Sequence, residues 1–144
     1  MTPRYDRLLK LAEHLKHGKL GHRNFNFNCF NDGGTHENPC GTNGCGIGEC
    51  PIVFKKDWEF RAIGDGLETK FFPVLKNLIA GYGSPNESAL KSILIFFKIN
   101  RDAAENLFYP ENRINPQGLP RNATKRQVAD NIIAWVEDYK KGGV

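Results

Sequence analysis

Residues 124–139 read TKRQVADNIIAWVEDY and carry the clearest helix signal in the chain. Thr124 and Gln127 have the spacing of a capping box, in which the side chain of each residue accepts from the backbone N–H of the other. Apolar residues then recur at or near the spacing of one helix face: Val128, Ile132, Trp135, Val136 and Tyr139. The stretch therefore predicts a terminal amphipathic helix that begins near Thr124.

The apolar spacing also predicts which side chains of this helix lie inside the protein. We expect Ile132 and Trp135 to be buried, because both lie on or near the apolar face. The cationic side chains of the same stretch should be exposed: Lys125, Arg126 and Lys140.

A second amphipathic helix is predicted over residues 5–17, with an apolar face made by Leu8, Leu11, Ala12 and Leu15. Thr2 and Pro3 offer an N-cap and a first-turn proline, so the helix should start near them. Gly18 suits the position after its end. His14 and His17 are three residues apart but lie off the leucine face, which favours exposed imidazoles over a metal pair.

Two further helices are predicted in the C-terminal half. Ser84-Pro85-Asn86-Glu87 is another capping box with a first-turn proline, and Asn100 can cap a shorter helix over 101–108 that Pro110 ends. The pair resembles a helix–turn–helix in outline, but the second helix offers DNA only Arg101, beside two acids. A packed helical pair is therefore favoured, and nucleic acid is not favoured as a partner.

The segment between these helices is less regular. Phe25, Phe27 and Cys29 alternate with asparagines, which indicates a short extended piece over 24–30. Thr42 could cap a short helix that runs to Cys50. Residues 51–83 give a mixed pattern, in which the core candidates are aromatic: Trp58, Phe60, Phe71 and Phe72.

The whole chain has the composition of a soluble globular protein. It has 144 residues, 40% hydrophobic and 25% charged, and we expect one mainly helical domain over 1–144 with a short extended element after the first helix. No apolar run reaches the length that spans a bilayer, and the N-terminal stretch lacks a secretory h-region. These features predict a cytoplasmic protein without a membrane partner. Residues 1–23 hold six Lys and Arg against two acids, so the basic excess lies mainly there.

Three of the four cysteines fall between Cys40 and Cys50, among four glycines. One hypothesis is a zinc site, because sulfur and imidazole are preferred zinc ligands. The candidate ligands are Cys29, His36, Cys40, Cys45 and Cys50. No C-x-x-C pair is present, so the favoured interpretation needs no metal or other cofactor: small thiols pack beside glycines as ordinary hydrophobic groups.

A cysteine nucleophile is the other chemical hypothesis. Cys40 or Cys45 near a helix start could have a lowered pKa, and His36 or His22 could serve as base. Residues 24–50, which surround these cysteines, contain no Lys or Arg and three acids. Negative charge nearby stabilises the thiol over the thiolate. The pattern therefore favours no catalytic residue.

Three short motifs resemble a group of uncharacterised bacterial and phage proteins of similar size. The first is C-G-T-x-x-C-x-x-G at Cys40 to Gly48, the second A-x-x-L-F-x-P at Ala104 to Pro110, and the third T-x-x-Q-V-A at Thr124 to Ala129. The resemblance implies a mainly helical fold and no particular chemistry. We therefore expect a small non-enzymatic accessory or binding module, with a protein partner left open. A zinc-stabilised domain and a cysteine-dependent enzyme are the alternatives.

Overall fold

The structure is a computed structural model that describes residues 2–21, 24–25, 43–44, 46–63, 70–78, 85–110 and 118–142. Within these ranges the chain is mainly helical, as the apolar spacing predicts, and it adds one antiparallel hairpin. The elements are α1 (Tyr5–His17), β1 (Asn24–Phe25), β2 (Asn43–Gly44), the 3₁₀ turn η1 (Ile47–Glu49), α2 (Cys50–Val53), β3 (Trp58–Ile63), β4 (Lys70–Leu75), α3 (Pro85–Phe97), α4 (Arg101–Phe108) and α5 (Lys125–Lys140).

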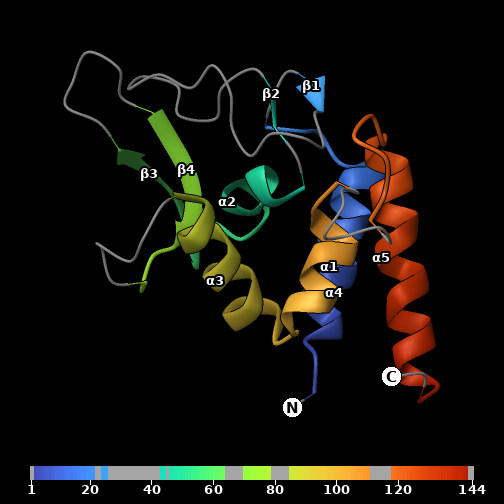
Figure 1. Cartoon of the computed structure of the whole chain (residues 1–144). Coiled ribbons are helices and arrows are strands. Elements are labelled where there is room, and N and C mark those ends of the chain that lie inside the picture. Colours follow the sequence, from blue (N-terminus) through green and yellow to red (C-terminus); the bar gives the residue numbers. More distant parts are fainter. Residues whose placement is uncertain are drawn as a thin grey trace.

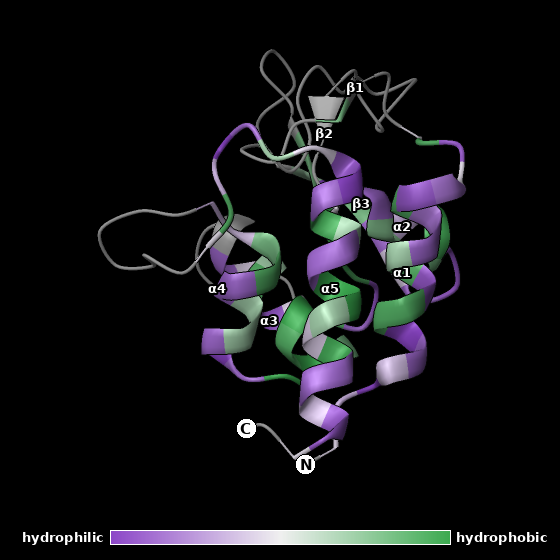
Figure 2. Cartoon of the chain, turned by 90° about the vertical axis from the view of Figure 1, so that its right-hand side faces the viewer, coloured by the Kyte–Doolittle hydropathy of each residue, from purple (hydrophilic) through white to green (hydrophobic). Residues whose placement is uncertain are grey.

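Helices α1 and α5 lie side by side and antiparallel (Figure 1). Lys16 bonds Asp130 at one end of the pair, and the Tyr5 and Tyr139 rings meet at the other, with centroids 6.2 Å apart. Figure 2 looks onto α5 and shows hydrophobic and hydrophilic bands alternating along it. The apolar faces of the two helices supply much of the core: Leu8, Leu11, Ala12 and Leu15 from α1, with Val128, Ala129, Ile132 and Val136 from α5.

The start of α5 confirms the predicted capping box. Thr124 Oγ1 accepts from the Gln127 N–H at 3.2 Å, and Gln127 Oε1 accepts from the Thr124 N–H at 2.8 Å. Ile132 is fully buried, and Arg126 and Lys140 are exposed as expected. The prediction for Trp135 was wrong, because its ring is only half-buried and stacks on Tyr139 beside the core. Lys125, predicted exposed, is also half-buried.

Helix α1 spans Tyr5–His17, the predicted range, but its N-cap is Arg4, without a side-chain cap bond, and not Thr2. The Arg4 N–H donates to the Phe97 carbonyl at 2.8 Å, so residues before the helix tie its start to the end of α3. Gly18 follows the helix as predicted, but with φ of −81°. It therefore fills this position without using the left-handed conformation that favours glycine.

The α3–α4 pair starts and ends as the sequence predicts. Helix α3 begins at Pro85, and the Asn100 side chain caps α4 by accepting from the Ala103 N–H at 2.9 Å. The buried side chains of α4 are Ala103, Ala104, Leu107 and Phe108. The second helix thus packs its apolar face into the core, and the Phe97 and Phe108 rings stack across the pair.

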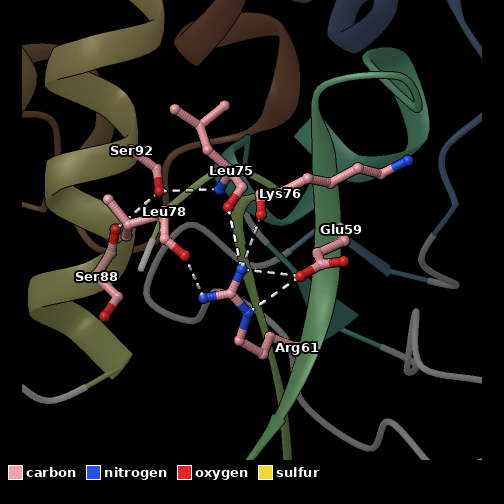
Figure 3. A network of polar contacts seen from close by, with 7 residues as sticks. All are labelled: Glu59, Arg61, Leu75, Lys76, Leu78, Ser88 and Ser92. Atoms are coloured by element: carbon pink, nitrogen blue, oxygen red, sulfur yellow. Dashed lines mark hydrogen bonds and ion pairs between the residues drawn. The ribbon is translucent and has the colours of Figure 1, made fainter. Parts of the chain in front are cut away.

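The hairpin β3–β4 lies beside α3 (Figure 1) and was not predicted as such. Arg61 on β3 ties the two strands together where β4 ends. The Arg61 guanidinium donates to Glu59 and to the carbonyls of Leu75, Lys76 and Leu78 (Figure 3). On α3, Ser92 Oγ accepts from the Leu75 N–H and donates to the Ser88 carbonyl. Of the aromatic core candidates, Trp58 is buried, whereas Phe60, Phe71 and Phe72 are half-buried.

The predicted helix from Thr42 to Cys50 was wrong. Asn43–Gly44 instead forms β2, which pairs in parallel with Asn24–Phe25, and helical structure starts only at Ile47 and continues to Val53. Pro51 suits this register because proline is tolerated in the first helical turn. The remainder of the predicted extended piece, residues 26–30, lies outside the described residues, and so does Thr42.

No helix within the described ranges has the length and apolar character needed to cross a membrane.

Candidate functional site

A buried carboxylate joins three segments at the C-terminal half of α1. Glu49 is fully buried, and its Oε1 lies 2.8 Å from Nε2 of His14 and 2.8 Å from the backbone nitrogen of Gly21. His14 Nε2 and Glu49 Oε1 form a hydrogen bond, and the imidazole N–H is its donor when the carboxylate is ionised. The bond fixes the plane of the imidazole and directs the other ring nitrogen, Nδ1, away from Glu49.

Two glycines make room for this arrangement. A Cβ on Gly18 would lie 2.6 Å from the His14 Nδ1, and a Cβ on Gly21 would lie 2.5 Å from Cγ1 of Ile52. Both distances are shorter than real Cβ contacts allow. Gly18 therefore lets the Nδ1 side of the ring lie close against the backbone, and Gly21 lets the chain approach Ile52 closely beside its bond to Glu49.

The half-buried side of His14 borders an open depression between α1 and α2. The depression measures about 460 Å³ and is lined by Lys10, Glu13, His14, His17, Gly18 and Val53. Charged and imidazole groups form its α1 side, and Val53 supplies an aliphatic surface from α2. This combination can accept hydrogen bonds, donate them and contact an apolar group within one small area.

Basic side chains lie along one face of α1, and three of them line the depression: Lys10, His14 and His17. Arg7, Lys10, His14 and His17 follow one another at intervals of three or four residues, which places them on the same helix face. Lys55 and Lys56 are exposed in the turn that follows α2. We call these six residues the basic surface.

Aromatic rings hold two cations of the basic surface in place. The Arg7 guanidinium carbon lies 4.1 Å from the centroid of the Phe96 ring, and its Nη1 donates to the Phe96 carbonyl at 2.8 Å. The Lys10 Nζ lies 5.6 Å from the centroid of the Phe54 ring. Cations placed over ring faces in this way are attracted by the ring quadrupole.

Arg4 at the start of α1 is engaged differently. Its guanidinium donates to both carboxylate oxygens of Asp6, at 2.9 and 3.1 Å. The hydrogen bonds from Arg4 lower the pKa of the Asp6 carboxyl, and Asp6 in turn raises the pKa of Arg4. Because this pair is self-compensating, Arg4 adds little charge to the basic surface.

The cysteine hypotheses fall mostly on residues that lie outside the described part: Cys29, His36, Cys40, Cys45 and the possible base His22. Within the described ranges no three His, Cys, Asp or Glu side chains are grouped closely enough to hold a metal. Cys50 is the one candidate ligand described, and it is buried with its Sγ 3.8 Å from the Gly46 carbonyl oxygen. Zinc binding and cysteine catalysis therefore remain alternative hypotheses.

The sequence does not identify His14 or Glu49 as partners. His14 was expected to be exposed beside His17, and that expectation was wrong for His14, although His17 is exposed. The carboxylate comes from a position 35 residues away, at the end of a glycine-rich segment with no strong helix pattern. One signal was available in the sequence: the basic residues of α1 recur at helical spacing from Arg7 to His17.

No family model matches the chain, and neither the curated proteins nor the solved structures contain a significant match to it.

Proposed function

We propose that this protein is a small non-enzymatic accessory or binding module of bacterial or phage type that holds an anionic partner on the basic surface. The observation that carries the proposal is the preorganisation of Arg7 and Lys10 over aromatic rings, since Lys10 also lines the open depression. A cation that is already held in place loses less side-chain entropy on binding than a freely moving one.

The charge balance of this region supports the same proposal. Arg7, Lys10, Lys55 and Lys56 carry positive charge, and the exposed acids in the same segments are Glu13, Asp57 and Asp6, the last of which is paired with Arg4. Positive charge is therefore in excess before either histidine is protonated. A surface of this kind steers anionic partners and speeds their association, and both effects weaken as salt is added.

The proposal is tested by calorimetric titration of the whole chain with polyglutamate at low ionic strength. We expect binding that weakens as the Debye length falls from about 30 Å at 0.01 M salt to about 10 Å at 0.1 M salt. Lys10→Glu should raise the dissociation constant roughly tenfold, equivalent to about 1.4 kcal/mol.

Arg126→Glu is the matched control, because Arg126 is exposed on α5, outside the basic surface, and the charge change is identical. A second variant combines Lys55→Glu with Lys56→Glu at exposed turn residues, so the protein should still fold. Weaker binding by this variant therefore reports the lost charge and not lost folding. The proposal fails if polyglutamate does not bind, or if Arg126→Glu weakens binding as much as Lys10→Glu does.

A further inference from the structure

We propose that the occupant of the basic surface is an acidic segment of a polypeptide that places an apolar side chain against Val53. This inference rests on the proposed function and names the class of partner. The inference follows from the mixture of apolar, cationic and anionic groups around the depression. A chain that carries only negative charge is not complementary to that mixture.

The aliphatic contact comes from α2. Val53 is half-buried and lines the depression, while Phe54, the next residue, packs edge-on against Phe96 and lies under Lys10. The cations therefore border a surface that still exposes hydrocarbon. An apolar side chain of a partner would remove that hydrocarbon from water, and this gain does not depend on salt.

The acids within the same area distinguish a peptide from a nucleic acid. Glu13 lines the depression and Asp57 follows Lys55 and Lys56 in the turn, and both are exposed. A phosphate backbone carries charge at every residue and is repelled by such carboxylates. A peptide carries backbone N–H groups between its acidic side chains, and these can donate to Glu13 while its carboxylates contact Lys10.

His14 adds a directional hydrogen-bonding group at the edge of the depression. Glu49 holds the ring through Nε2, and the Nδ1 side of the ring faces Gly18, which also lines the depression. In the tautomer that carries its proton on Nε2, Nδ1 is an acceptor, and a backbone or side-chain N–H of a peptide is the matching donor. Phosphate groups, which are acceptors when ionised, do not supply that donor.

The test compares three probes by calorimetry on the whole chain: a peptide of alternating glutamate and leucine, polyglutamate, and a single-stranded oligodeoxynucleotide. We expect the Glu/Leu peptide to bind roughly tenfold more tightly than the other two and to keep most of its affinity when salt is raised. Val53→Ser should reduce peptide affinity severalfold while leaving polyglutamate binding unchanged. Ile95→Ser is the matched apolar-to-polar control, because Ile95 is exposed on α3, outside the basic surface. It should change neither the affinity for the Glu/Leu peptide nor the affinity for polyglutamate.

The outcomes separate this inference from the function on which it rests. If polyglutamate or the oligonucleotide binds as tightly as the Glu/Leu peptide, the acidic-peptide inference is wrong and the anion-binding proposal stands. If Val53→Ser weakens all probes equally, the hydrocarbon contact is not specific to the peptide and the inference is again wrong. If no probe binds, both proposals fall.

Discussion

Nε2 of His14 on α1 and Oε1 of Glu49 form a 2.8 Å hydrogen bond, although 35 residues separate them along the chain. The same oxygen accepts the Gly21 N–H, so one buried carboxylate fixes the helix, the segment that follows it and the turn before α2. The position of the depression beside His14 therefore depends on Glu49.

Replacing Glu49 should destabilise the protein strongly. Glu49→Ala leaves His14 Nε2 and the Gly21 N–H without this partner, and a buried polar group left unsatisfied costs roughly 1–3 kcal/mol. Glu49→Gln keeps an acceptor oxygen and nearly the same shape, so it should cost less. Urea denaturation of the two variants checks this, and equal midpoints for Glu49→Ala and the native protein would contradict it.

Gly21→Ala should also destabilise, for a steric reason. The new Cβ would overlap Cγ1 and Cδ1 of Ile52, so the Ile52 side chain must shift, and we expect a cost of about 1 kcal/mol, the low end of overpacking. Shortening the neighbour should relieve the overlap, so Gly21→Ala combined with Ile52→Ala should be less than additive. A thermal denaturation cycle over the four proteins measures that coupling. If the destabilisation by the two single substitutions simply adds in the double variant, the new Cβ at position 21 and the Ile52 side chain do not overlap.

The Asp6 carboxyl should titrate below its ordinary range. Its pKa is lowered mainly by hydrogen bonds from Arg4, so the pair contributes stability above the unfolded-state pKa and loses it as pH falls through the folded-state pKa. The effect on stability should be small, because both side chains are exposed to solvent and screened. Carbon-detected NMR titration should show the Asp6 pKa rising toward normal in Arg4→Ala. An unchanged Asp6 titration in that variant would refute the assignment.

Cys50 should behave as a packing residue. Its thiol is buried against the Gly46 carbonyl, so alkylation at neutral pH should be slow, and Cys50→Ala should cost about 1 kcal/mol, as for an average substitution. A chelator should leave the melting temperature unchanged. One equivalent of zinc by elemental analysis, with a large chelator-induced drop in melting temperature, would establish the zinc-stabilised alternative instead.

The sequence predicted the helices well because their caps and apolar faces depend on residues that lie close together in the chain. Thr124 with Gln127, Asn100, and the leucines of α1 act within one or two turns, and these helices form where expected. The hairpin was missed because what fixes its end is not local: Arg61 bonds carbonyls 14 to 17 residues further along the chain.

The candidate site could be predicted only in part. The basic spacing on α1 is visible in the sequence, whereas the depression needs α2 to be packed against it and Glu49 to reach His14. The predicted helix from Thr42 failed because Asn43–Gly44 pairs with Asn24–Phe25, a tertiary contact that overrides a possible cap.

The most direct test of the proposed basic surface is NMR mapping of the whole chain during titration with polyglutamate. The account predicts that amide and imidazole signals shift progressively at Lys10, His14 and His17 on α1 and at Lys55 and Lys56 after α2, and that Lys10→Glu suppresses these shifts. Saturating polyglutamate that leaves these signals in place, or that shifts mainly the exposed residues of α5, would contradict it.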